Sequence, residues 1–178
     1  VGKKALTIAA DDKQKTYGQA NPTLTFTYAG LTNGDSKAAT EPSISTTAIA
    51  SSSVGKYPIT LTGAADANYD ITLKAGELEV TKATLTITAD NKSKVYGQEN
   101  PALTFTYSGL TNGDSKAATE PSISTTATQS SNAGTYPITL TNGSDDNYEI
   151  TLKAGILTVG KKALTITADD KQKTYGQA

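Results

Sequence analysis

LTITADNKSKVYGQENPALTFTYSGLTNGD, residues 85–114 of this chain, has a close copy, LTIAADDKQKTYGQANPTLTFTYAGLTNGD, at residues 6–35. The offset of 79 residues extends well beyond these stretches. When residues 1–79 are aligned with residues 80–158 without a gap, 57 of the 79 positions agree. Self-similarity at a fixed period is the sequence signature of tandem modules. The chain is therefore expected to repeat one small fold rather than to form a single large domain.

The end of the chain begins the repeat a third time, because residues 159–178 reproduce residues 1–20 with a single change. We expect a β module over residues 1–80, a second over 81–158, and the first strand and loop of a truncated third repeat over 159–178. A division into 21–99 and 100–178 is equally regular, so the phase of the module stays open at this point.

Each unit is dominated by strict alternation of apolar and polar residues. In one run Leu24, Phe26 and Tyr28 alternate with Thr25 and Thr27. This period of two is typical of strands that turn one face toward a core and a threonine-rich face toward water. The inward set is predicted to be Leu6, Ile8, Leu24, Phe26, Ile44, Ile59, Leu61, Ile71, Leu73, Leu78 and Val80, with their copies 79 positions later.

The connections between these runs carry turn signals. Asn33-Gly34 predicts a tight turn, and residues 36–39 are the one candidate for a helical turn in the unit. Lys74-Ala75-Gly76 separates two alternating runs, which predicts a three-residue hairpin loop with glycine in the left-handed region. Residues 42–46 predict a short strand at a sheet edge, because Pro42 cannot donate to a ladder.

The boundary between the two units lacks the composition of a linker. Residues 78–87 read LEVTKATLTI, without glycine, proline or serine. A flexible connection is therefore not expected. The inward positions change parity between Leu78 and Leu85, which indicates a twist or bulge near Lys82-Ala83. We expect the chain to pass directly from one core into the next, so that the modules form a rod.

Composition excludes several classes of function. The chain has no Cys, His, Met or Trp, its 16 basic residues are all lysines, and its net charge is −1. Disulfides and zinc sites are thereby excluded, and no basic stripe is present to follow nucleic acid or an acidic membrane surface. No apolar run reaches the length of a transmembrane helix. Without histidine, and with no lysine or carboxylate in an apolar context, we expect no catalytic residues and no cofactor.

One acidic loop has the oxygen ligands that calcium prefers. It runs from Asn142 to Asn147, and its candidate ligands are Asp145, Asp146 and Asn147. The equivalent loop of the first unit, residues 63–68, keeps only two of these ligands. A site built into the module should occur in both copies, so we expect the loop to be solvated, with Asp and Asn in turn roles.

The tyrosines of each unit allow two interpretations. Tyr17, Tyr57 and Tyr69, with their copies in the second unit, have aromatic faces on which a sugar could stack. Alternatively they are core and corner residues whose hydroxyl groups find backbone partners. We favour the second interpretation, because a unit of this size has few other large apolar side chains.

A family resemblance joins these features. Residues 85–114, followed by AGTYPITL at 133–140, NYEITL at 147–152 and GILTV at 155–159, resemble the MBG-type repeat with a Tyr-Gly-X signature. That repeat occurs in arrays in large bacterial surface adhesins. The resemblance implies an extracellular stalk or adhesin module at the bacterial cell surface, with a small β-sandwich or β-grasp-like fold. We therefore expect an all-β or β-rich α+β chain, with at most one short helical turn in each module.

Two functions follow from the repeat. In the first, each unit is a structural spacer that contacts its neighbouring repeats and projects a distal binding domain. In the second, the array itself binds a glycan or host surface protein multivalently. The 22 differences between the copies, such as Ile49 to Thr128 and Lys56 to Thr135, fall mostly in loops and on outward positions. A binding face repeated for avidity should keep its contacts, so this drift favours the spacer.

Overall fold

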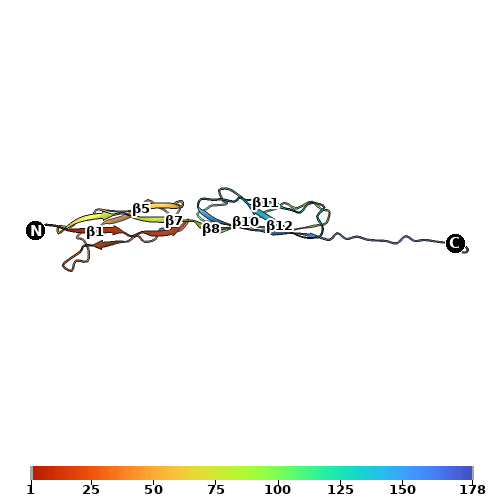
Figure 1. Cartoon of the computed structure of the whole chain (residues 1–178), viewed down its shortest axis with the longest axis horizontal. Coiled ribbons are helices and arrows are strands. Elements are labelled where there is room, and N and C mark those ends of the chain that lie inside the picture. Colours follow the sequence, from red (N-terminus) through yellow and green to blue (C-terminus); the bar gives the residue numbers. More distant parts are fainter. Residues whose placement is uncertain (1, 178) are drawn as a thin grey trace.

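The computed structural model describes residues 2–177 as two β modules placed end to end (Figure 1). Within these residues there are fourteen strands and no helix, and therefore no helix long and apolar enough to cross a membrane. The first module contains β1 (Lys4–Ala10), β2 (Lys13–Thr16), β3 (Phe26–Ala29), β4 (Ser43–Thr46), β5 (Gly55–Thr62), β6 (Tyr69–Lys74) and β7 (Gly76–Thr81). The second contains β8 (Ala83–Ala89), β9 (Lys92–Val95), β10 (Phe105–Ser108), β11 (Ser122–Thr125), β12 (Gly134–Thr141), β13 (Tyr148–Lys153) and β14 (Gly155–Gly160).

Each module is a sandwich of two sheets. In the first module one sheet has the order β3-β1-β6 and the other β2-β7-β5-β4. The second module repeats this arrangement with β10-β8-β13 and β9-β14-β12-β11. The pairs β1–β6 and β2–β7 are parallel, whereas the remaining pairs of the first module are antiparallel. The all-β expectation is confirmed, and two facing sheets without a helix identify a sandwich rather than a β-grasp.

The core of each module lies between its two sheets. Leu6 and Ile8 of β1 pack against Ile59 of β5 and Leu78 of β7, and all four are buried. This confirms the alternation, because the threonines between these residues face outward or lie half-buried. Leu24, Phe26, Ile44, Ile71 and Leu73 also pack on the core, but they are only partly buried.

The chain changes sheets where a hairpin was predicted. β6 ends at Lys74 and β7 begins at Gly76, yet the two strands belong to different sheets and do not pair. The predicted hairpin is therefore wrong, and Gly76 is not in the left-handed region. Its small size is needed for packing, since a Cβ on Gly76 would lie 2.7 Å from the carbonyl oxygen of Ala10. The inward-facing residues change from odd to even positions across Ala75, where the chain passes from one sheet to the other.

Between β1 and β2 the chain also passes from one sheet to the other. Asp11 and Asp12, which lie between these two strands, hold the crossing together. The backbone N–H of Glu77 donates to Asp12 Oδ1 at 2.8 Å, and the hydroxyl of Thr25 donates to the carboxylate of Asp11. In the second module Asn91 replaces Asp12, and its Oδ1 accepts the N–H of Ile156 at 2.8 Å. An acceptor oxygen at this position is therefore sufficient, and charge is not required.

Two further sequence predictions can be compared with the structure. Asn33 and Gly34 both have positive φ, 57° and 82°, and form the expected tight turn, closed by the N–H of Asp35 donating to the carbonyl of Thr32. Residues 36–39 form no helical turn. β4 lies at the edge of its sheet, as predicted from Pro42.

The modules are joined by one residue, Lys82, between β7 and β8. This confirms the direct passage from one core into the next, and Figure 1 shows that the result is a rod. Beyond Gly160 the chain extends away from the second module, and residues 161–177 are exposed and form no strand.

Candidate functional site: the junction between modules

The Tyr-Gly pair reaches the end of the first module because of the register of one strand pair. β2 runs parallel to β7, with Thr16 opposite Thr81. β7 leads directly into the second module, so the residue after Thr16 lies where the chain crosses over. The N–H of Tyr17 donates to the carbonyl of Thr81 at 2.8 Å, which holds the loop at this point. Gly18 follows with φ +81°, a conformation that side chains disfavour.

A buried lysine supports this loop from within the first module. Lys15 is 5 % exposed, and its ammonium group donates to the carbonyls of Gln19 at 3.0 Å and Ile49 at 2.5 Å. Burial lowers the pKa of Lys15. Lys94 repeats the arrangement with the carbonyls of Gln98 and Thr128. Because a buried ammonium needs acceptors, each lysine fixes two loops around itself.

The second module offers a preformed acceptor for the loop. β13 pairs with β8 so that Tyr148 lies opposite Ala83, the first residue after the junction. The Tyr148 hydroxyl accepts the N–H of Thr111 at 3.0 Å and donates to Asp114 Oδ2 at 2.7 Å. These contacts bring the Thr111–Asp114 turn over the tyrosine ring. We call Thr111, Asn112, Asp114 and Tyr148 the acceptor cup.

Tyr17 inserts its side chain into the acceptor cup. Its ring meets the ring of Tyr148 edge-on, with centroids 5.5 Å apart and an interplanar angle of 82°. Its hydroxyl donates to Asp114 Oδ2 at 3.1 Å and accepts Asn112 Nδ2–H at 3.0 Å. Edge-to-face aromatic pairs and hydrogen bonds to a carboxylate both stabilise a contact beyond the effect of its buried area. The contact is therefore specific in its geometry as well as apolar.

Two further contacts surround this insertion. A Cβ on Gly18 would lie 2.4 Å from the side-chain oxygen of Thr111, so only glycine permits this approach. On another side, the N–H of Val54 donates to Asn147 Oδ1 at 3.0 Å. Val54 and Tyr57, both from the first module, also pack against the buried cluster that joins Tyr17 and Val80 to the core of the second. The two cores thus meet across the junction.

Comparison of the two copies of the Tyr-Gly loop shows that the junction buries the tyrosine side chain. Tyr17 is 7 % exposed, whereas Tyr96, its copy at the far end of the second module, is 44 % exposed. The backbones of the two loops are alike. The N–H of Tyr96 donates to the carbonyl of Gly160 at 2.9 Å, as that of Tyr17 does to Thr81, and Gly97 has φ +87°. The difference in exposure therefore comes from the neighbouring module and not from the loop.

The tyrosines considered as sugar platforms have other contacts. Tyr69 is buried, with its hydroxyl donating to Asp35 Oδ2 at 2.7 Å, and the half-buried Tyr57 donates to the carbonyl of Ser53 at 2.9 Å. These positions agree with the core and corner interpretation. Tyr17 is also a buried core residue, but the cluster that it joins is that of the next module, and its hydroxyl bonds side chains of that module. Sequence reasoning missed this role, because Tyr17 reaches the junction through the parallel pairing of β2 with the exit strand β7, which joins residues far apart in the sequence.

The calcium candidates lie beside the junction. Asp145 accepts the N–H of Asn147 with Oδ1 and the N–H of Ala118 with Oδ2, both at 2.8 Å. Asn147 uses its own oxygen for Val54. Among residues 2–177, no three His, Cys, Asp or Glu side chains gather in a group that could hold a metal ion. The oxygens of Asp145 and Asn147 therefore act in turn formation and in the junction.

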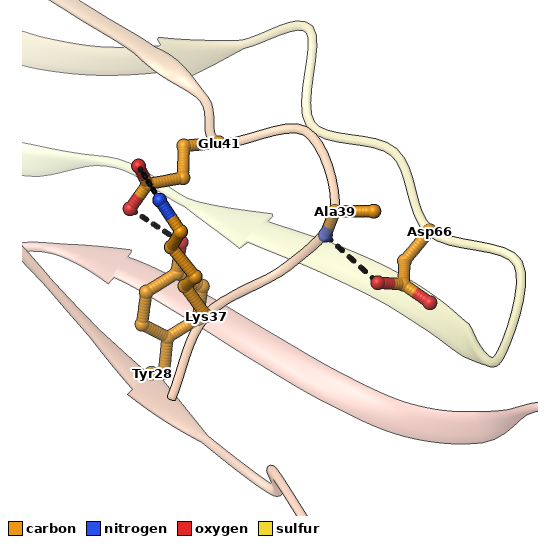
Figure 2. Close-up of polar contacts among 5 residues, drawn as sticks. All are labelled: Tyr28, Lys37, Ala39, Glu41 and Asp66. Carbon is orange, nitrogen blue, oxygen red and sulfur yellow. Dashed lines mark hydrogen bonds and ion pairs between the residues drawn. The ribbon is translucent and has the colours of Figure 1, made fainter. Parts of the chain in front are cut away.

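Figure 2 shows the equivalent turn of the first module. Asp66 Oδ2 accepts the N–H of Ala39 at 2.8 Å, and its Oδ1 accepts the N–H of Asn68. These backbone donors lower the pKa of Asp66. Beside it, Glu41 accepts from Lys37 and from the hydroxyl of Tyr28, both at 3.3 Å. Lys37 and Glu41 are exposed, so this ion pair contributes little to stability.

The junction is expected to weaken at alkaline pH. Burial, together with the hydrogen bond to Asp114, raises the pKa of Tyr148 to about 12. An unfolded tyrosine loses its proton near pH 10. Between pH 10 and pH 12 the folded state keeps the Tyr148 proton that the unfolded state has lost. The stability of the second module therefore falls as pH rises from 10 toward 12. Urea unfolding over this range should show a smaller fall for Tyr148→Phe, and an equal fall would contradict the assignment.

Comparison with known proteins supports the repeat. The sequence model described as MBG domain (YGX type) matches residues 6–79 and again residues 85–158. No curated protein matches the chain. The matched residues lie within the two modules, and they include Tyr17-Gly18 and Tyr96-Gly97, the residues that form the inserting loop.

Proposed function

Because the chain belongs to the MBG domain family of the YGX type, in two tandem copies, we propose that it is a non-catalytic spacer of a bacterial cell-surface adhesin. Repeats of this kind suggest a module of surface proteins. In this function each unit adds length and projects a distal binding domain away from the cell. The partners of each unit are then the adjacent repeats.

The observation that carries this proposal is the junction. A spacer must transmit direction as well as length, and a hinge at each boundary would let the array collapse. Here Lys82 is the single connecting residue, and Tyr17, Gly18 and Val54 contact the second module around it. Contacts on several sides of a connection oppose bending and rotation about it.

The alternative function is a repeated adhesive module for a glycan or host protein. It requires side chains presented to a ligand, and large aromatic groups are the usual platforms for sugars. Tyr17, Tyr69 and Tyr148 instead point into the junction or the core. The outward strand faces are dominated by threonine, and the copies differ there. The spacer is therefore the better supported function.

Small-angle scattering of the whole chain at low concentration tests the proposal. A compact globule of this length would have a radius of gyration of about 16 Å. Two modules end to end, each about 35–45 Å long, should give roughly 20–26 Å, and the extended C-terminal residues add to it. A value near the compact figure would contradict the spacer function. The adhesive alternative would then become the preferred one.

A further inference from the structure

The chain enters each module through an inner strand of one sheet and leaves it through an inner strand of the other. In the first module the entering strand β1 lies between β3 and β6, and the leaving strand β7 lies between β2 and β5. Lys82 then connects β7 to β8, which lies between β10 and β13. Entry and exit are at opposite ends of each module (Figure 1). A pull along the rod therefore acts on strands that are held by neighbours on both sides.

Two parallel strand pairs form one continuous ribbon along each module. β1 pairs with β6, and β2 pairs with β7. Lys4 lies opposite Tyr69 and Lys13 opposite Leu78, so both pairs have the same offset of 65 residues. The offset is the same again in β8–β13 and β9–β14. The register therefore continues where the paired chains pass from one sheet to the other. We call β1–β2 with β6–β7, and β8–β9 with β13–β14, the ribbon of each module.

A side chain bridges the ribbon at the crossing between the sheets. Asp12 lies between β1 and β2, and its Oδ1 accepts the N–H of Glu77 at 2.8 Å. Asn91 accepts the N–H of Ile156 at the same distance in the second module. Hydrogen bonds therefore join the two chains of the ribbon before, at and after the crossing.

We propose that the ribbon is a shear clamp that lets each module bear tension along the rod. Tension pulls β1 toward the N-terminal end and β7 toward the C-terminal end, so the two chains of the ribbon must slide past each other. The bonds of a parallel ladder are evenly spaced along the strands, and sliding loads all of them at once. That the module meets tension in the cell rests on the proposed spacer function, because a projected binding domain pulls on its stalk when its target holds it.

Pulling single molecules of the full chain in two directions tests the clamp. The sequence has no cysteine, so a pair of introduced cysteines supplies the only thiol attachment points. Gly2→Cys with Lys161→Cys, both at exposed positions, makes the chains of the ribbon slide. Lys3→Cys with Ala67→Cys, also exposed, separates β1 from β6 sideways. These two residues lie at the same end of the module, since Lys3 Nζ donates to the carbonyl of Asp66 at 3.0 Å.

The direction of pulling should decide the force at which a module unfolds. Unfolding under force depends on the barrier along the direction of pulling, so equal stability does not imply equal force. We expect end-to-end pulling to unfold each module at about twofold or more the force of sideways pulling. Each end-to-end event should lengthen the chain by roughly 215–250 Å, because the 79 residues of a repeat extend from a module about 35–45 Å long. Equal forces in the two directions would overturn the proposal.

Two substitutions at the crossing show whether the ribbon bears the load. Asp12→Ala removes the acceptor of the Glu77 N–H, so one of the two end-to-end events should shift to lower force while the other stays unchanged. Asp12→Asn is the matched control, because Asn91 has this role in the second module, and both events should keep their force. Unchanged forces in Asp12→Ala, or an equal loss in both variants, would contradict the clamp. A rod that unfolds easily in both directions would refute the clamp alone, since the radius of gyration tests the spacer separately.

Discussion

Tyr17→Ala should uncouple the two modules while leaving each of them folded. Tyr17 buries its ring against Tyr148, and its hydroxyl bonds Asp114 and Asn112 across the junction. A tyrosine of this kind buries about 150–250 Å², which corresponds to roughly 4–6 kcal/mol at ~25 cal/mol per Å² before losses from relaxation. We expect about 3 kcal/mol of coupling to disappear. Guanidinium unfolding should then separate into two transitions, and scattering should show a broader range of lengths.

Tyr96→Ala is the matched control for this change. The loop is the same, the backbone contacts are the same, and the residue is 44 % exposed because no module covers it in the monomer. Exposed substitutions usually change stability by less than about 0.5 kcal/mol. If the two variants lost equal stability, the effect of Tyr17→Ala would belong to the loop, and the junction contact would be refuted.

A second pair of variants tests the same contact by adding atoms instead of removing them. Gly18 and Gly97 have φ of +81° and +87°, so alanine is strained at both positions. Only at Gly18 would the new methyl group meet Thr111, at 2.4 Å, whereas at Gly97 it would meet nothing within 4 Å. The excess loss for Gly18→Ala therefore measures the collision across the junction. Scattering should show bending in this variant alone.

Ile87→Ala should cost about 3–5 kcal/mol and unfold the second module selectively. Ile87 is fully buried in β8, the central strand of its sheet. Removing large aliphatic side chains from such sites costs about 2–5 kcal/mol, because the cavity closes only in part. A module of this size has a stability of only about 5–10 kcal/mol. Circular dichroism during thermal unfolding should show one half of the strand signal lost at a lower temperature.

Two further substitutions give reference values for the loss of stability expected in Ile87→Ala. Thr151→Ala, on the exposed face of β13, should change stability by less than about 0.5 kcal/mol. Phe105→Ala should fall between the two, since Phe105 lies in the edge strand β10 and is only partly buried. A loss for Phe105→Ala larger than that for Ile87→Ala would contradict the position of the core described above.

Alternation along the strands determined which face of each sheet is buried. In an extended backbone successive side chains point to opposite faces of the sheet, so alternate residues lie on the same face. This places Leu78 with Val80, and Leu85 with Ile87. The tight turn at Asn33-Gly34 and the direct passage at Lys82 were predictable because each depends on residues close together in the sequence. The repeat was evident from comparing the sequence with itself.

Which strands pair was decided only by the tertiary structure. Lys74-Ala75-Gly76 is compatible with a hairpin and with a crossing between sheets, since both need a short turn between two apolar runs. In the fold β1 and β6 run parallel in one sheet, and Gly76 passes close to Ala10 as the chain enters the other sheet. A contact between residues so far apart leaves no mark in the local pattern.

The junction shows most clearly which features the sequence determines and which only the tertiary structure determines. Tyr17 and Tyr96 are both followed by Gly and Gln and have equivalent backbone contacts, yet one is 7 % and the other 44 % exposed. The sequence alone placed both side chains at equivalent positions of two copies of one unit, whereas their place beside the exit strand follows from strand pairing in the tertiary structure. Whether such a side chain is buried depends on the cup of Tyr148, Asp114 and Asn112, which chain folding assembles from segments about 95 residues or more away.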